Sequence, residues 1–520
     1  MAANALEKEA QQRLKDARAA KAQIEVDLRE GYFFTAPRRS KDVTSNTIVT
    51  SDRKREDDSS ILQTSLGMEV AQDFATEMLN TFTPEVINWV DQKAGIDMPE
   101  EEFADIKEDV DAQTAKIMSA IKASNFYAAA AQAYMPDLGL GTVGLWIDSL
   151  RPAEPIVCQH VPLRELEINI GPYGEVDDRF IVRSTRYRNV PALLPGIRLP
   201  EEVTKKVKDA PNVACQVRWG FWRRWDIQSD VVWQRVVMIG EKVVDDGLLR
   251  GEGSCPLIVG RMNVDQSFPF GDGPTLQALP ELRRLDELEG LDVEAFDFRV
   301  HKPFFYPDDG VINLSGGIQP GMGYPARPWG SGTPFVPMEF GSESMTEEYK
   351  FQKIEARIRR LHFIDFPEQV GKTPPTAEQW LDELARAKRR IGTPGKVFWK
   401  EFPAQVFLRF KYLLEQRGVI APVKVDGNEI ALVPYDPTEQ AQEHQDVQVA
   451  GRILEMARAY FPQLSEVLVD GPKTLANIKT KLRDGVVVLR SQDEIMQTVQ
   501  DLAPVLGGGA GGMPPGGEVA

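Results

Sequence analysis

Residues 268–379 constrain the fold of this chain more than any other stretch. Two segments with helical periodicity, residues 275–301 and 343–364, flank a module rich in Gly and Pro at residues 302–342. A helix of about 20 residues is about 30 Å long. The pattern therefore predicts two long helices joined by a small cap, a hairpin suited to lining a tube or to bridging two layers.

The first of these helices has leucine at every third position. Because an α-helix turns about 100° per residue, every third residue falls about 60° behind the last, so the leucines wind around the helix instead of forming one stripe. A helix that is apolar on several sides needs more than one packing partner. The leucines are Leu276, Leu279, Leu282, Leu285, Leu288 and Leu291.

The second helix has a narrower apolar stripe that includes Ile354, Ile358 and Leu361, with charged residues on its other face. Periodicity alone favours a helical hairpin packed on its own domain. The alternative is a helix pair packed between copies of the chain in a ring.

Length and composition set further bounds. A chain of 520 residues is too long for one core, so two to four subdomains are expected. No apolar run approaches the ~18 residues of a membrane span. Cys158, Cys215 and Cys255 are too few and too scattered for a disulfide framework or a metal site, which fits a reducing compartment.

The net charge of −17 argues against a protein that grips nucleic acid with a basic surface. It remains compatible with a protein past which nucleic acid slides, because tight phosphate contacts would retard sliding.

Residues 1–135 are predicted to be mostly helical. Residues 4–29 carry few large apolar side chains and predict an exposed helix, whereas residues 32–60 are polar and predict a loop. Apolar spacing over residues 61–80 predicts a helix with a buried face. Residues 99–133 predict one long helix that opens with acidic residues, which suit the positive end of the helix dipole.

Gly139, Gly141 and Gly144 spell G-x-G-x-x-G. A dinucleotide site needs that motif after a strand and at the start of a helix, so that the helix N-terminus meets the pyrophosphate. Here a helix comes first and a strand follows. The pattern therefore favours a turn in which glycine permits positive φ.

Residues 156–261 are predicted to be β-rich. Alternation and turn residues predict a hairpin of strands 166–170 and 179–186. A group of aromatic residues farther along could stack nucleic-acid bases, but a sheet core or interface is favoured because no basic groove surrounds them. This group comprises Trp219, Phe221, Trp222 and Trp225. A lysine cluster could contact phosphate, although a solvated helix face is the usual explanation. The lysines are Lys205, Lys206 and Lys208.

Beyond the second long helix, residues 365–375 (DFPEQVGKTPP) predict a loop, and Thr376 with Gln379 forms a capping box that begins another helix. Pro403 predicts a kink in a helix over residues 396–416. Residues 419–433 alternate like a short hairpin around Asp426-Gly427.

The order of these segments resembles the portal, or head-to-tail connector, proteins of short-tailed bacteriophages. The resemblance covers about residues 60–500 and rests on three stretches. The first is NFY at 125–127 with GTVGLWID at 141–148. The second is GRM at 260–262 with FPFGDGP at 268–274 and ALPELRRL at 278–285. The third is TAEQW at 376–380 with FPAQVFLR at 402–409 and GVI at 418–420.

The resemblance implies an α+β fold, mainly α, that assembles into a ring of usually twelve subunits. Its parts would be a wing at residues 1–274 and 376–436, with helices over 1–135 and a β-rich part over 140–261. The paired stem helices would be 275–301 and 343–365, with a clip at 302–342 and a tunnel loop at 366–375. A helical crown would occupy 437–505, and 506–520 would be a disordered tail.

The implied role is a passive channel at the head–tail vertex of the virion, assembled in the host cytoplasm, through which double-stranded DNA is packaged and ejected. Implied partners are other copies of the chain, capsid or scaffold protein, terminase and tail adaptors, with no membrane. Glu368, Gln369 and Lys372 would face DNA in the tunnel loop. The stem would pack between subunits through Leu279, Leu282, Leu285, Leu288, Leu291, Ile354, Ile358 and Leu361.

No enzyme, cofactor or metal site is predicted. The chain has no G-x-x-x-x-G-K-[ST] and no G-x-S-x-G, and its four histidines lack metal-ligand spacing. The packaging ATPase would thus be a separate protein. The alternative function is another structural virion protein, such as a tail adaptor or scaffold, without a DNA channel. A nucleotide enzyme that uses Gly139–Gly144 ranks far behind.

Overall fold

A computed structural model describes residues 2–42, 58–86, 88–149, 156–228, 230–307, 319–326, 336–337, 345–364, 392, 395–422 and 430–434, with residues 449–452, 454–456 and 474. The chain divides into two units, Met1–Pro434 and Tyr435–Ala520. The elements described below belong to the first unit. It mixes helices and strands, so the predicted α+β class is confirmed.

The largest sheet is a five-stranded antiparallel meander in the order β4-β5-β6-β7-β8. Its strands are Leu166–Ile170, Val176–Arg186, Ala214–Arg223, Val232–Ile239 and Lys242–Arg250. The predicted hairpin is confirmed as β4 and β5, with β5 beginning three residues earlier than expected. Short helices α6 (Val190–Leu193) and α7 (Glu201–Asp209) lie between β5 and β6.

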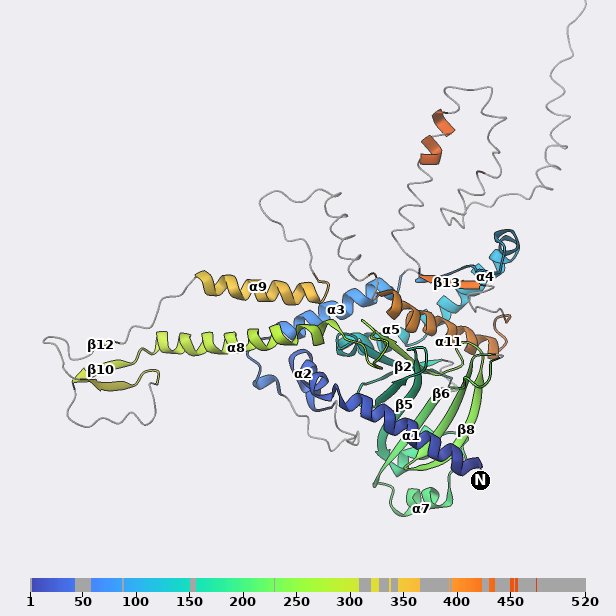
Figure 1. Ribbon diagram of the computed structural model, residues 1–520, viewed down its shortest axis with the longest axis horizontal. Coiled ribbons are helices and arrows are strands. Elements are labelled where there is room, and N and C mark those ends of the chain that lie inside the picture. The colour runs from blue at the N-terminus through green and yellow to red at the C-terminus, as the bar shows by residue number, and fades with distance from the viewer. Residues whose placement is uncertain are drawn as a thin grey trace, which may run out of the picture. The chain divides into compact units, whose positions relative to one another are not determined.

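Helix α1 (Ala2–Ala22) lies across this sheet (Figure 1). The prediction of an exposed helix is wrong, because Ala10, Leu14 and Ala17 are buried against Phe180 and Trp222 of the sheet. Two alanines and one leucine at i, i+4 and i+7 form a narrow apolar stripe on the face that packs against the strands. A composition with few large apolar residues hid that stripe.

The segment predicted as a loop over residues 32–60 is also partly helical, so that prediction is wrong at its start. Helix α2 (Glu25–Thr35) buries Tyr32 and Phe34, and a 3-10 helix follows at Pro37–Asp42. A further 3-10 turn spans Asp58–Ser60. Residues 43–57 lie outside the described residues.

A second sheet has the antiparallel order β3-β2-β9, with strands Val157–Val161, Thr142–Asp148 and Leu257–Arg261. Helices α3 (Leu66–Phe82), α5 (Phe126–Ala133) and α11 (Pro403–Gln416) share one hydrophobic core with it. None of the helices in the described part of the chain is both long and apolar enough to cross a membrane.

The helix predicted over residues 99–133 is two helices, α4 (Glu100–Ala123) and α5. The chain breaks at Ser124 and Asn125 because their side chains bond locally. The Ser124 hydroxyl accepts a hydrogen bond from the Phe126 amide, and the Asn125 side-chain amide makes two 2.8 Å bonds with the Cys158 backbone. Tertiary bonding of this kind overrides helical periodicity.

Gly141 confirms the predicted glycine turn between a helical segment and β2. Its φ is +100°, and an added Cβ would lie 2.3 Å from the Gly271 carbonyl oxygen. Glycine is therefore required both by backbone conformation and by the close passage of residues 271–273.

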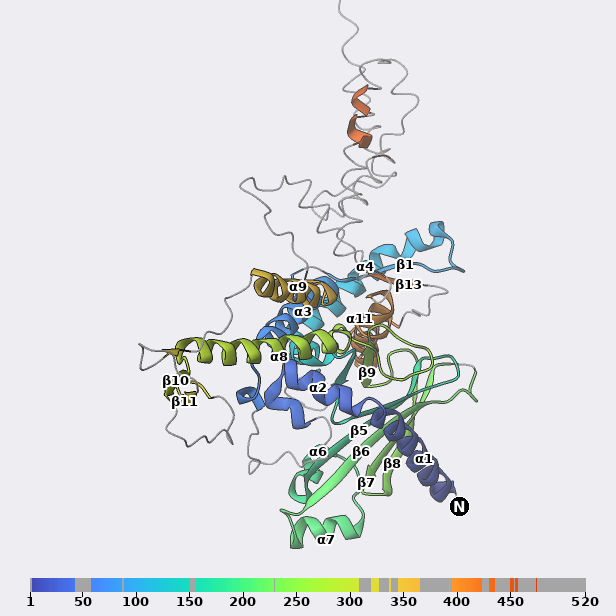
Figure 2. The same ribbon diagram turned by 60° about the vertical axis from the view of Figure 1, so that its left-hand side comes forward.

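Helices α8 (Pro274–Val300) and α9 (Met345–Leu361) form the predicted long pair. They lie side by side, as Figures 1 and 2 both show. Between them in sequence, β10 (Phe304–Pro307) pairs parallel with β11 (Gly323–Ala326) and antiparallel with β12 (Val336–Pro337).

The break expected at Pro403 is confirmed: residues 395–401 are helical, Phe402 is a turn residue with φ −117° and ψ −71°, and Pro403 begins α11. The predicted hairpin over residues 419–433 is not formed in its described part. Residues 419–422 contain no strand, and β13 (Ile430–Pro434) pairs instead with β1 (Val90–Ala94). The predicted tunnel loop, the helix expected over 376–391, most of the predicted crown and the tail lie outside the described residues.

Candidate subunit interface on the long helix pair

The base of the α8–α9 pair is buried within its own chain. Leu279, Leu282 and Leu285 pack in one core with Ile354 and Ile358 of α9. These five residues were predicted to pack between subunits; within the single chain none of them is more than 5% exposed. Leu288 and Leu361 are partly buried beside the same core.

The winding leucines find their several partners inside the chain. Leu276 lies between two cores, one shared with α3 and α9 and the other with α2 and the strands. Helices α2 and α9 both contact α8. The inference that such a helix needs more than one partner is therefore correct at the base, but there the partners come from the same chain.

The distal half of α8 differs sharply from its base. Leu291, Val293, Phe296 and Val300 are 54%, 61%, 59% and 57% exposed. Val293, Phe296 and Val300 are spaced i, i+3 and i+7 and share one face, whereas Leu291 lies on the opposite side of the helix. The sequence analysis missed these three residues, although their spacing was a readable signal.

Charge also distinguishes the two helices. Acidic side chains outnumber basic ones on α8, and the reverse holds on α9. Within the chain, Arg357 of α9 pairs with Glu281 of α8. Complementary charge of this kind would also favour α8 of one copy lying against α9 of another.

His362 lies at the end of α9, where the helix pair meets the rest of the unit. It is 2% exposed. Its Nδ1 is 2.9 Å from the Ile358 carbonyl oxygen, to which it donates, so Nε2 accepts from the Thr275 hydroxyl at 3.1 Å. Both ring nitrogens of His362 and the Thr275 hydroxyl therefore have hydrogen-bond partners while the imidazole is neutral.

Burial lowers the pKa of His362 to about 4. The unfolded chain binds a proton near pH 6.5 and the folded chain does not, so the folded state loses stability as pH falls from 6.5 through 4. Replacing His362 by Gln should remove about 3 kcal/mol of that pH dependence. Urea denaturation of both proteins at pH 7 and pH 4 measures it; identical pH profiles would contradict the assignment.

Two buried arginines hold the surrounding elements together. Arg261 of β9 donates to Glu401 through Nε and Nη2, at 3.1 and 2.5 Å, and to the Gly174 carbonyl at 3.0 Å. Arg409 of α11 donates to the Ile147 and Ser254 carbonyls at 3.0 and 2.7 Å. These bonds fix the helical segments 395–401 and 403–416 to the β3-β2-β9 sheet and the loops beside it.

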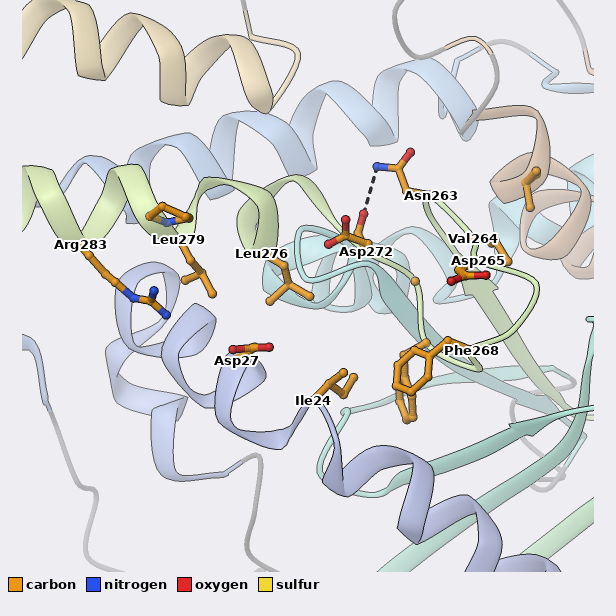
Figure 3. A pocket seen from close by; sticks show the side chains of 14 residues that line it. Ile24, Asp27, Asn263, Val264, Asp265, Phe268, Asp272, Leu276, Leu279 and Arg283 are labelled. Atoms are coloured by element: carbon orange, nitrogen blue, oxygen red, sulfur yellow. Dashed lines mark hydrogen bonds between the residues drawn. The ribbon is translucent and has the colours of Figure 1, made fainter.

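An open groove of about 910 Å³ lies beside the base of α8 (Figure 3). Ile24, Phe268 and Leu276 give it apolar walls, and Asp27 and Asp265 lie at its rim. Its residues include no nucleophile–base pair. Among the residues that the structure describes, no three His, Cys, Asp or Glu side chains are placed to hold a metal ion.

The other sequence candidates are resolved as follows. Phe221 and Trp222 are buried in the five-stranded sheet, so the sheet-core interpretation of the aromatic group is confirmed for them. Lys206 lies on α7 with its ammonium 5.4 Å from the Tyr187 ring. Glu368, Gln369 and Lys372 lie outside the described residues.

Comparison with known proteins decides the family. Residues 7–481 match the family described as bacteriophage head to tail connecting protein. The chain belongs to this family. Family members are structural components of the virion, which places this head-to-tail connecting protein at the head–tail junction and outside the enzymes.

No curated protein matches the chain. Among solved structures, a chain in the neck of an empty gene transfer agent particle is 14% identical, with a TM-score of 0.32, over 75% of this chain and 87% of that one. A chain in the virion of a native gene transfer agent particle is 13% identical, with a TM-score of 0.32, over 78% and 93%.

Proposed function

We propose that this connector forms a ring, most simply of twelve copies, through which double-stranded DNA enters the head and later leaves it. The observation that carries the proposal is the exposed apolar half of α8. Four large apolar side chains stand on two opposite sides of one helix that continues from a well-buried base. Exposed apolar clusters mark interaction sites.

Opposite faces of one helix can be covered only by two different neighbours. A contact in which each subunit uses one face toward one neighbour and a different face toward the next is heterologous, and a heterologous contact closes into a ring when its rotation permits. The acidic excess of α8 and the basic excess of α9 suit the same head-to-tail arrangement.

The net charge supports passage rather than tight binding of DNA. Twelve copies with a net charge of −17 each have a total net charge of about −204. Walls of that sign repel phosphates, so they would allow a duplex to slide without the strong contacts that would hold it.

In this proposal residues 1–274 and 376–436 form the wing, 275–301 and 343–365 the stem, 302–342 the clip, 366–375 the tunnel loop and 437–505 the crown. The ring would first dock the terminase and later the tail adaptors, and would be incorporated by capsid or scaffold protein. The described β10–β12 sheet lies within the clip range.

Negative-stain imaging of the purified protein tests the ring directly, and native mass spectrometry gives its copy number. The expected image is a closed ring with an axial channel. A large assembly without a channel would indicate a tail adaptor or scaffold instead, and a species no larger than a dimer under all conditions, including with scaffold, would contradict the ring.

Lys372 is the only basic residue in the proposed tunnel loop. Lys372→Ala should lower the yield of packaged DNA severalfold without affecting assembly, because it removes the loop's one favourable contact with phosphate. Quantifying DNA in purified particles measures the effect. Lys400→Ala, an exposed lysine outside the loop, is the matched control; equal packaging by both variants would remove Lys372 from the DNA path.

A further inference from the structure

A second cavity, of about 650 Å³, opens between the 3-10 helix Pro37–Asp42, the loop after β3, and the end of β5. Three arginines line it, each from a different one of these elements: Arg39, Arg164 and Arg183. Glu165 is the one carboxylate among the lining residues. The whole chain has a net charge of −17, whereas positive side chains outnumber negative ones among the residues that line this cavity.

The guanidinium of Arg183 is held in place from two sides. Its Nε donates to Glu165 at 2.9 Å and its Nη1 to the Gln159 side chain at 3.5 Å. Its central carbon lies 5.9 Å from the centre of the Trp219 ring. A guanidinium has five N–H donors, so these contacts orient the group while using two of them.

The guanidinium of Arg39 is oriented in a similar way. It lies 5.3 Å from the centre of the Tyr32 ring, and its Nη2 is 3.6 Å from Asp137. Asp137 is fully buried and also bonds His160 at 2.7 Å and the Tyr32 hydroxyl. A buried carboxylate, an aromatic ring and a histidine therefore fix Arg39 at the cavity wall.

Neutral hydrogen-bonding groups complete the lining. Ser184 and Thr185 of β5 and Asn189 are among the lining residues. Three planar cations with hydroxyl and amide groups around one concave space match an anion with several oxygens, because guanidinium forks bond two such oxygens at once. A simple carboxylate has two oxygens and one charge, too few to engage three arginines.

We propose that this cavity binds a phosphate-class oxyanion, either free as a small phosphate compound or as the backbone phosphate of a nucleic acid. The cavity is larger than one phosphate group needs, so a diphosphate or two successive backbone phosphates fit it best. Binding would tie the N-terminal 3-10 helix to the five-stranded sheet. The proposal depends on the folded chain and not on ring formation.

Isothermal titration of the purified protein with inorganic pyrophosphate tests the site. Wild type should bind, and Arg164→Gln should weaken binding by about tenfold, since it removes a charge-assisted contact. Arg188→Gln makes the same charge change on the neighbouring segment but outside the cavity lining, and should change the affinity by less than about twofold. Equal losses in both variants would overturn a specific site.

Ala192→Glu provides a test that removes no native side-chain contact. Ala192 is an exposed lining residue on α6, so a carboxylate there should abolish pyrophosphate binding by repulsion while leaving the thermal midpoint near that of wild type. Unchanged binding in this variant, or no binding by wild type, overturns the proposal.

A competition experiment separates the two sources of phosphate. If a short DNA duplex displaces pyrophosphate from wild type, and binds Ala192→Glu more weakly than it binds Arg188→Gln, the cavity takes backbone phosphate. If the duplex does not compete while pyrophosphate binds, the ligand is a small free oxyanion. Salt dependence of the duplex affinity gives an independent count of phosphate contacts.

Discussion

Replacing Phe296 by Asp should prevent subunit assembly and leave a folded monomer. Phe296 is 59% exposed on the distal half of α8, so the substitution removes little of the packing within the isolated chain. Between subunits, it would remove about 1.5–3 kcal/mol of apolar burial at each interface and would place a carboxylate in an apolar contact, which costs more. Size-exclusion chromatography with light scattering measures the result.

The loss of interface stability is repeated at every subunit contact, because each interface in a ring carries the same substitution. Leu291→Asp, on the opposite side of α8, should have the same outcome, since each subunit needs both faces. The matched control is Ile96→Asp, which makes the same chemical change at a side chain that is 91% exposed and lies outside α8 and α9. Intact rings from Phe296→Asp and Leu291→Asp would show that distal α8 lies outside the interface.

The sequence predicted the elements whose signal is local. The helix pair, the β4–β5 hairpin, the glycine turn at Gly141 and the break at Pro403 each depend on periodicity or on the backbone of one residue. The structure confirms all four within a few residues. These features can be predicted from the sequence because each is determined by residues that are close together in the chain.

Features that depend on distant partners were missed. The apolar stripe of α1 packs against the five-stranded sheet, and a contact residue in that sheet, Phe180, lies more than 150 residues farther along the chain. Strand β13 looked like half of a local hairpin, yet its partner β1 lies at residues 90–94. Periodicity reports which side of an element is apolar, but it does not report what covers that side.

At the candidate interface, too, the local pattern was predicted from the sequence and the partners that cover it were not. Leucine spacing correctly indicated several packing partners for α8, but it could not tell a neighbouring subunit from α2 and α9 of the same chain. The exposed fractions of Leu291 and Phe296 show that these two side chains, unlike the leucines at the base, are left largely uncovered by their own chain. The arginine cavity had no sequence signal, because Arg39, Arg164 and Arg183 meet only through the tertiary fold.

Replacing Arg409 by Ala should destabilise the folded chain by about 3–5 kcal/mol, the typical cost of removing one partner from a buried charged network. Arg409 is 4% exposed. It donates to the Ile147, Gly253 and Ser254 carbonyls and to Asp148, at 2.7–3.2 Å. Without it, three carbonyl oxygens and a carboxylate lose a charged hydrogen-bond donor.

Two further substitutions separate hydrogen bonding from packing at this position. Arg409→Met keeps much of the side-chain volume but supplies no donor, so it should be almost as destabilising as Ala. Arg409→Lys keeps the charge but presents a single head that cannot reach four acceptors on two segments, so it should recover only part of the loss. Arg417→Ala, at the exposed C-cap position of α11, should change stability by less than about 0.5 kcal/mol.

Chemical denaturation followed by tryptophan fluorescence measures these differences. If Arg409→Met were as stable as wild type, volume rather than hydrogen bonding would hold α11 to β2. The close approach of Gly253 favours the bonded account: its φ is +68°, and an added Cβ would lie 2.3 Å from the Leu408 carbonyl oxygen. The loop before β9 thus passes directly against α11, where the Arg409 guanidinium satisfies the carbonyls that this contact removes from water.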